Sequence, residues 1–182
     1  ALRPRQPGSS IKPVVYSTAI DSAVVSPATM LWDLRVDYPM NFDKTKKYTP
    51  RNYDEKLRGP VTVRMALANS LNIPTLKLFD GVDPDTFVST ANKLGLTNIN
   101  TDTLNNYGLV TALGAAEVRL IDLATAYHAI ANHGEFVEAT PILSITDGAG
   151  NPIKLKAVRP SEQAISPQAA FIVTDIMSDN KA

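Results

Sequence analysis

Residues 5–13 of the chain read RQPGSSIKP. Ser9 stands three residues before Lys12, within a frame of glycine and proline. Residues at i and i+3 are neighbours on a helix surface, so this hydroxyl and this amine are expected to lie together. Because proline is tolerated only in a helix's first turn, Pro13 predicts a helix that begins near Ser9 or Ser10.

A serine hydroxyl becomes an effective nucleophile when a neighbouring base takes its proton. The helix dipole favours a developing alkoxide on Ser9 and disfavours a charged Lys12, and partial burial would also favour the neutral amine. Ser10 has proline three residues on and therefore no base. The alternative is a capping serine beside a solvated lysine, and chance supplies a second Ser-x-x-Lys pattern at residues 178–181.

A second group of polar residues, Ser70-Leu71-Asn72, follows a predicted helix that ends near Ser70. Since Pro74 predicts a new helix start, Ser70 and Asn72 are expected on a loop, where both side chains can point into one cleft. There Ser70 can relay a proton to a leaving group, and the Asn72 amide can bind a substrate carbonyl and the Lys12 amine. The alternative is that both residues cap backbone groups between two helices.

The composition is that of an ordinary globular domain, with 182 residues, 44% hydrophobic and 20% charged. Eighteen basic residues balance eighteen acidic ones, which argues against nucleic acid as a partner because phosphate binding needs a basic excess. No apolar run reaches 18 residues, so these residues are not expected to span a membrane. Without cysteine, and with only two histidines, neither a metal site nor a cofactor is expected.

Hydrophobic periodicity predicts a mostly helical α+β fold with one β-hairpin. The hairpin is expected at residues 141–156, around the turn Asp147-Gly148-Ala149-Gly150, and residues 22–60 are expected to form a long irregular loop region. Helices are predicted from near Ser9 through Ile20, from Thr62 to Ser70, from Pro74 through Phe79, from Asp83 to Gly95, from Glu117 to Gly134, and from Ser166-Pro167 through Ile176.

Several longer blocks of the sequence resemble the transpeptidase domain of class A penicillin-binding proteins, the bifunctional enzymes that polymerise and cross-link bacterial cell wall. The blocks occur in the family's order along nearly the whole chain, which makes them more specific than any three-residue motif. They are RQPGSSIKP at 5–13, NYD at 52–54, GPVTVRMALANSLNIP at 59–74, LGAAEV at 113–118, AY at 126–127, ANHG at 131–134 and ISPQ at 165–168.

The resemblance implies a serine D,D-transpeptidase that forms its acyl-enzyme on Ser9. It further implies that Lys12 is the base, Ser70 the proton relay and Asn72 a substrate-orienting ligand. The implied partners are the D-Ala-D-Ala stem peptide of peptidoglycan and β-lactams such as penicillin. The sequence Ser178-Asp179-Asn180 spells a motif that some β-lactamases use. At the end of the last predicted helix it is expected to be a coincidence, because polar residues are common there.

The family's third motif, Lys-Thr-Gly, is missing from residues 1–182. The resemblance therefore implies a partial transpeptidase domain: the helical part of the penicillin-binding protein and serine β-lactamase fold, with most of the central antiparallel sheet outside these residues. On this interpretation, the first and last helices expose apolar faces that the missing strands would cover. The implied location is the extracytoplasmic face of the bacterial membrane, with a membrane anchor and a glycosyltransferase domain outside these residues.

Two other functions stay open from the sequence. One is a β-lactamase-type hydrolase, which needs a base to activate water; between Thr97 and Leu113 the sequence offers Asp102 and no glutamate, so rapid deacylation is not expected. The other is a non-catalytic sensor or scaffold that keeps the penicillin-binding fold.

Overall fold

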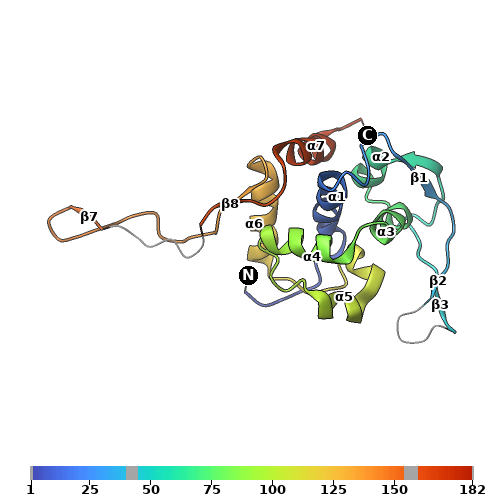
Figure 1. Ribbon diagram of the computed structural model, residues 1–182, viewed down its shortest axis with the longest axis horizontal. Coiled ribbons are helices and arrows are strands. Elements are labelled where there is room, and N and C mark those ends of the chain that lie inside the picture. The colour runs from blue at the N-terminus through green and yellow to red at the C-terminus, as the bar shows by residue number, and fades with distance from the viewer. Residues whose placement is uncertain (1, 40–44, 154–159, 182) are drawn as a thin grey trace.

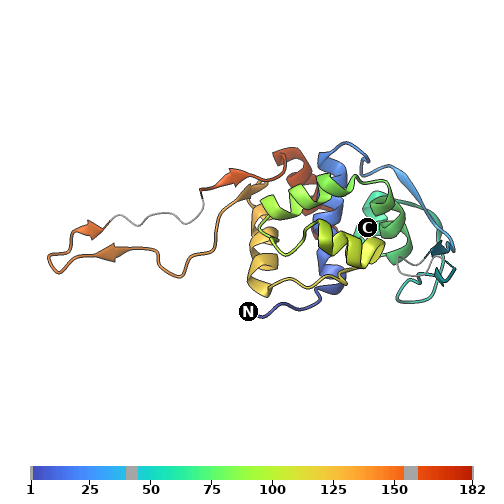
Figure 2. The same ribbon diagram turned by 60° about the horizontal axis from the view of Figure 1, so that its bottom comes forward.

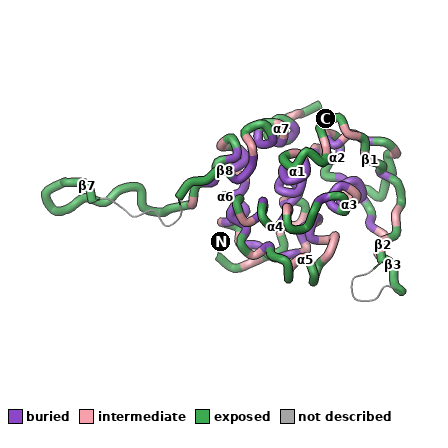
Figure 3. Tube along the Cα trace, viewed as in Figure 1, coloured by how far each residue is buried: buried purple, intermediate pink, exposed green. Residues whose placement is uncertain are grey.

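Helix α1 (Lys12–Asp21) runs through the centre of the molecule, and other helices pack around it (Figure 1). Every residue from Lys12 to Ala19 is buried, as the purple α1 segment of Figure 3 shows. A helix that is buried around its whole circumference is one that other elements surround. These observations come from a computed structural model that describes residues 2–39, 45–153 and 160–181.

The surrounding helices and two short 3-10 segments of the described residues together make one hydrophobic core. In chain order they are η1 (Gly8–Ile11), α2 (Val63–Ala68), α3 (Asn72–Asp80), α4 (Pro84–Lys93), α5 (Thr101–Tyr107), η2 (Gly108–Leu113), α6 (Leu120–Ala131) and α7 (Pro167–Ser178).

Three predicted helix starts are confirmed by their caps. The side chains of Thr62, Asp83 and Ser166 accept hydrogen bonds from backbone N–H groups in the first turns of α2, α4 and α7. Such caps satisfy N–H groups that have no partner within the helix. Two other starts differ from expectation, because α3 begins at Asn72 and α6 begins at Leu120.

The strands form four separate antiparallel pairs of two strands each within the described residues. Strand β1 (Met30–Asp33) pairs with β4 (Gly59–Thr62), with Met30 opposite Thr62, and β2 (Tyr38–Pro39) pairs with β3 (Lys47–Tyr48). The prediction that residues 22–60 are irregular is therefore wrong in part. These strands are two to four residues long, and β2 and β4 each contain a proline, so the alternating pattern that reveals a longer strand is absent.

Residues 141–156 were predicted as a hairpin, and β6 (Ile145–Thr146) and β7 (Pro152–Ile153) confirm an antiparallel pair there. The Asp147 carboxylate accepts N–H groups of Ala149 and Asn151 and so fixes the turn. The hairpin projects far from the helices in both views (Figures 1 and 2). Strands β5 (Glu135–Phe136) and β8 (Glu162–Gln163) pair at its base, whereas residues 154–156 of the predicted hairpin lie outside the described residues.

The expectation of exposed apolar faces is wrong for α1 and confirmed for α7. Helices α3, α4 and α7 all pack against α1 and leave it no exposed face. On α7, however, Phe171 is 68% exposed and Met177 is 49% exposed, although Ala170 and Val173 are buried in the core. The outer surface of α7 is therefore partly apolar.

Candidate active site

Ser9 lies in η1, directly before the buried central helix, and its side chain is exposed. It opens into a cavity of about 180 Å³ that Lys12 and Ser70 also line, together with Tyr127 and residues at the end of α7. Pro13 stands near the start of α1, as its missing N–H requires. The predicted helix start near Ser9 or Ser10 is replaced by a 3-10 turn, so Ser9 lies directly before α1 and Lys12 is its first residue.

Lys12 is the least expected feature of this cavity, because a lysine is almost never fully buried without partners. It is only 1% exposed, and its Nζ donates to three oxygens: Ser70 O at 2.5 Å, Asn72 Oδ1 at 2.8 Å and Ser70 Oγ at 3.1 Å. Burial disfavours the ammonium ion and lowers the pKa of Lys12 from 10.5 to about 8. The neutral amine is therefore much more accessible near neutral pH than it is for a solvated lysine.

Ser70 lies in the left-handed backbone region that favours glycine, as do Ala23, Glu55 and His133. Its φ is +52°, and it follows the last turn of α2. The Ser70 N–H donates to Leu67 O and the Leu71 N–H donates to Ala66 O, each at 2.9 Å, which is the hydrogen-bond pattern of a Schellman helix end. A residue with a Cβ is strained in this region, so a serine here points to a role for its hydroxyl group.

Asn72 lies in the first turn of α3, not on the loop predicted from sequence. Its Oδ1 accepts from Lys12 Nζ at 2.8 Å, and its Nδ2 donates to Arg51 O, also at 2.8 Å. The two ends of the amide are thus fixed in opposite directions. An amide nitrogen carries two hydrogens, so the Arg51 contact uses only one of the two N–H donors of Asn72 Nδ2.

Ser9, Lys12 and Ser70 line the cavity, whereas Asn72 does not line it and reaches the site through its hydrogen bond to Lys12. Ser70 and Asn72 stand 58 and 60 positions after Lys12 in the chain. Among the described residues no hydrogen bond joins Ser9 Oγ to Lys12 Nζ, since the three hydrogens of a lysine ammonium already match its three oxygen partners. A larger cavity, of about 280 Å³ beside Arg119 and Asp122, has no serine or lysine among the described residues that line it.

Two contacts that the sequence did not predict hold the Ser9 turn in place. The Tyr127 hydroxyl of α6 donates to Ser10 O at 2.9 Å, and Ser10 Oγ donates to Pro7 O at 2.7 Å. Gly114 lies against the Gly8 backbone so closely that a Cβ at position 114 would overlap it. Both Gly114 and Tyr127 fall in the blocks of family resemblance, which was the available signal for them.

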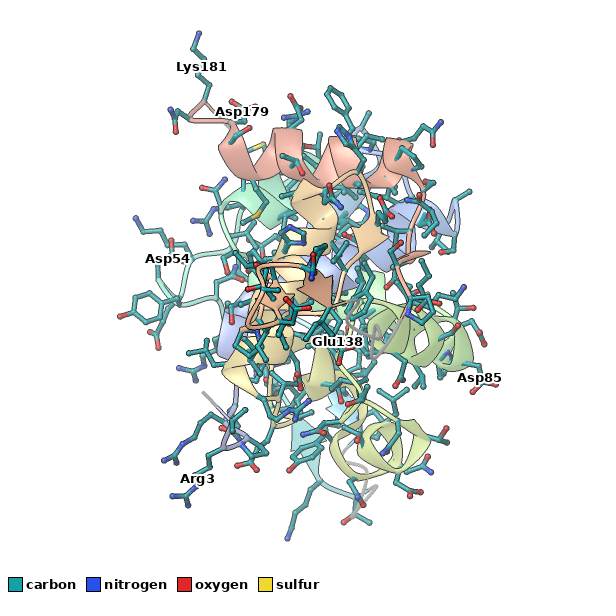
Figure 4. All side chains as sticks on the ribbon, turned by 90° about the vertical axis from the view of Figure 1, so that its left-hand side faces the viewer. Arg3, Asp54, Asp85, Glu138, Asp179 and Lys181 are labelled. Atoms are coloured by element: carbon teal, nitrogen blue, oxygen red, sulfur yellow. The ribbon has the colours of Figure 1, made fainter. Side chains whose placement is uncertain are left out.

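The Ser178-Asp179-Asn180 sequence lies where α7 ends, near the cavity. Ser178 Oγ donates to Asp175 O at 3.2 Å, and Asp179 lines the cavity while it accepts from Arg64 of α2 at 2.9 Å. Figure 4 shows Asp179 and Lys181 at this tip of the molecule. Ser178 is not among the residues that line the cavity.

The family described as the penicillin-binding protein transpeptidase domain matches residues 3–182. The chain belongs to this family. The resemblance to its class A branch is confirmed by relatives such as penicillin-binding protein 1A/1B of Bacillus subtilis, 34% identical over 94% of this chain. Penicillin-binding protein 1C of Escherichia coli is 34% identical over 72% of this chain.

The penicillin-binding fold is also shared with solved structures. Penicillin-binding protein 1A of Haemophilus influenzae superposes with a TM-score of 0.80 at 20% identity, covering 98% of this chain and 31% of that one. Penicillin-binding protein A of Mycobacterium tuberculosis, solved as an imipenem acyl-enzyme, has a TM-score of 0.80 at 20% identity and covers 96% of this chain and 43% of that one. The predicted fold class is therefore confirmed.

This chain spans less than a fifth of the length of its two named relatives, 18% of the Bacillus protein and 16% of the Escherichia protein. Within the described residues, none of the helices is both long enough and apolar enough to cross a membrane. The described part of the chain also contains no group of three or more His, Asp or Glu side chains placed to hold a metal ion.

Proposed function

We propose that this chain carries the nucleophile side of a serine D,D-transpeptidase that cross-links peptidoglycan stem peptides. Ser9 is the proposed nucleophile, Lys12 its base, and Ser70 the proton relay, while Asn72 orients the substrate. The proposal is supported mainly by the environment of Lys12. This lysine is buried, its Nζ is hydrogen-bonded to Ser70 and Asn72, and it lines the same cavity as Ser9. A solvated lysine beside a capping serine does not fit this burial.

The protonation state of Lys12 decides whether Ser9 can react. The neutral amine keeps two N–H donors, which match the backbone oxygen of Ser70 and Oδ1 of Asn72, because these two partners can only accept. The third position, which faces the Ser70 hydroxyl, then holds a lone pair. Lys12 in this form can accept a proton from Ser9, directly or through Ser70.

Acylation follows from this arrangement. Ser9 Oγ attacks the carbonyl carbon of the penultimate D-alanine, a C–O bond forms, and the Ser9 proton moves to Lys12 Nζ. When the C–N bond breaks, the proton passes through Ser70 Oγ to the nitrogen of the departing D-alanine. The free N–H of Asn72 can donate to a carbonyl of the substrate and so hold the peptide against Ser9.

Transfer of the acyl group reverses the steps of acylation, with a different amine in place of D-alanine. An amine from a neighbouring stem peptide attacks the ester carbonyl, a C–N bond forms, the C–O bond to Ser9 breaks, and the amine proton returns to Ser9. A penicillin acylates Ser9 by the same attack on its lactam carbonyl. Its nitrogen stays tethered to the acyl group after the C–N bond breaks, so the product is retained and obstructs the incoming amine.

A β-lactamase-type hydrolase is the main alternative, and the position of Asp102 disfavours it. Asp102 is exposed in the first turn of α5 and does not line the cavity with Ser9. Hydrolysis of the acyl-enzyme needs a base that activates water beside the ester. A non-catalytic scaffold is the other alternative, but a scaffold has no need for a strained Ser70 hydroxyl beside a buried amine.

The proposed partners and location follow from family membership. The proposed partners are stem peptides ending in D-Ala-D-Ala and β-lactams, and the remainder of a transpeptidase domain supplies the Lys-Thr-Gly wall of the cleft. The proposed location is the extracytoplasmic face of the bacterial membrane, where peptidoglycan is assembled, with the anchor outside residues 1–182.

Intact-mass measurement of the complete natural protein with a penicillin tests the proposed function. An adduct of one penicillin that persists for many minutes is expected for the transpeptidase. Release within seconds would indicate the hydrolase, and absence of any adduct would indicate the scaffold. Incubation with a D-Ala-D-Ala stem peptide and an amine acceptor should then yield the cross-linked product and free D-alanine.

A further inference from the structure

Asn52 is a buried asparagine, 4% exposed, in the connection between β3 and β4. Its Nδ2 donates to the two carboxylate oxygens of Asp33, at 2.8 and 2.9 Å, and to Lys56 O at 2.8 Å. Its Oδ1 accepts from the backbone N–H groups of Asn72, at 2.9 Å, and Ile73, at 3.3 Å. The whole hydrogen-bonding capacity of this amide is therefore used.

Asn52 thereby caps helix α3 from a position 20 residues earlier in the chain. The residue that precedes α3, Leu71, has no side chain able to accept a hydrogen bond and makes no side-chain cap. The N–H groups in a helix's first turn need an acceptor from elsewhere. Since Asn72 is the first residue of α3, this distant cap acts directly on the backbone of a proposed site residue.

Asp33 on β1 fixes which way the Asn52 amide faces. Its carboxylate is completely buried and also accepts from the backbone N–H of Arg58 at 3.0 Å, with the Arg58 guanidinium 3.8 Å away. A carboxylate only accepts, so it requires the NH2 side of Asn52. If the Asn52 amide turned over, oxygen would face oxygen at Asp33 and nitrogen would face nitrogen at Asn72.

The residue before Asn52 completes the hold on Asn72. Arg51 O accepts from Asn72 Nδ2 at 2.8 Å, while Asn52 holds the Asn72 backbone. Two consecutive residues therefore fix both the main chain and the side chain of Asn72. The remaining end of that amide, Oδ1, is aimed at Lys12 Nζ, 2.8 Å away.

We propose that Asn52, oriented by Asp33, is a positioning residue of the acylation step, which holds Asn72 so that its Oδ1 binds the Lys12 amine. This inference rests on the proposed function, in which Lys12 is the base for Ser9. Asn52 does not line the cavity and is not proposed to touch substrate. It acts through Asn72, and its effect should appear in how Lys12 holds and releases a proton.

The variant Asn52→Ala in the complete natural protein tests the inference through penicillin acylation of Ser9. Loss of the hold on Asn72 should lower the second-order acylation rate of the folded protein by about ten- to hundredfold, because small misplacements near reacting groups have effects of this size. The pH midpoint of acylation should also move to lower pH, since protonated Lys12 loses an acceptor. Asp179, the carboxylate that lines the same cavity, is paired with Arg64 and is unchanged in this variant.

Asp83→Ala is the matched structural control. It removes the side chain that caps α4, where Asp83 accepts from the Thr86 N–H at 2.8 Å, at an exposed helix start outside the Ser9 cavity. This variant should lose thermal stability as any cap removal does, while its acylation rate per folded molecule and its pH midpoint stay at the wild-type values. Tyr53 is the fully exposed neighbour of Asn52, and Tyr53→Ala should alter neither the acylation rate nor the pH midpoint.

Asp33→Asn is the second variant and keeps the volume of the buried side chain. It places an NH2 group against Asn52 or forces that amide to turn over, so the same two effects are expected. Wild-type acylation rate and midpoint in either folded variant would overturn the inference. If the wild-type protein is not acylated on Ser9, the proposed function fails as well. If it is acylated and either variant has the same rate and midpoint, only the positioning role fails.

Discussion

Lys12 Nζ lies 2.5 Å from the backbone oxygen of Ser70 and 3.1 Å from Oγ of the same residue. Ser70 therefore provides two of the three oxygens that satisfy the buried ammonium group. One of these partners can only accept, whereas the hydroxyl can also donate. The Ser70 hydroxyl can therefore accept a hydrogen bond from the charged amine. After Lys12 has lost a proton, the same hydroxyl can donate a hydrogen bond to the lone pair of the neutral amine.

The rate of acylation should depend on pH through Lys12. Burial lowers the pKa of this lysine to about 8, and only the neutral amine accepts the Ser9 proton. The penicillin acylation rate should therefore rise about tenfold per pH unit below pH 8 and level off above it. A stopped-flow series from pH 6 to pH 10 measures this profile. A rate that is constant or falls over the range would contradict Lys12 as base, and Lys12→Arg should be inactive throughout.

Ser70→Gly should separate stability from activity. Glycine relieves the positive φ of residue 70, so the free energy of unfolding is expected to rise by up to about 1 kcal/mol. The same change removes the hydroxyl beside Lys12, and acylation of Ser9 should fall about a hundredfold or more. Thermal unfolding and penicillin labelling of one preparation measure both effects. A variant that is more stable and equally active would show that the hydroxyl is not required.

The glycine at position 114 should be essential for the geometry of the Ser9 turn. A Cβ there would overlap the Gly8 backbone, and the φ of Gly114 is +78°. Gly114→Ala should destabilise the protein by about 1–3 kcal/mol and slow acylation, because Gly8 must move and Ser9 follows it. Gly148→Ala in the projecting hairpin is the control, since a Cβ added at Gly148 would meet nothing within 4 Å. Equal activity of the two variants would contradict this role of Gly114.

Much of the fold was predictable because it depends on local signals. Thr62, Asp83 and Ser166 are caps that stand directly before the helices they start. Helix α5 was missed although Asn100 caps it, because it has no buried residue and hence no apolar periodicity. The pairing of β1 with β4 joins residues about 30 apart through strands of four residues each, and no local pattern specifies it.

The proposed site was predictable only through the resemblance of longer blocks. The spacing of Ser9 and Lys12 is local, but the contact of Lys12 with Ser70 joins residues 58 positions apart. Capping rules search the residues that precede a helix, and therefore they did not find Asn52 as the cap of α3. The burial of Lys12 depends on α2, α3 and α7 packing around α1, which composition does not specify.

Ser178 should have no part in acylation, although it belongs to a second Ser-x-x-Lys pattern. Its hydroxyl donates to Asp175 O in the last turn of α7, and it does not line the Ser9 cavity. Ser178→Ala should label with penicillin at the wild-type rate and change the free energy of unfolding by less than about 0.5 kcal/mol. A large loss of labelling in this variant would show that the end of α7 takes part in the reaction.

The most direct test of the proposed function is to locate the penicillin adduct by peptide mass spectrometry in wild type and in Ser9→Ala. We expect one adduct, on the peptide that contains Ser9 and Lys12, and none in the Ser9→Ala protein, with unchanged labelling in Ser178→Ala. An adduct that persists after Ser9→Ala, or one located on any other residue, would contradict the assignment of Ser9 as nucleophile.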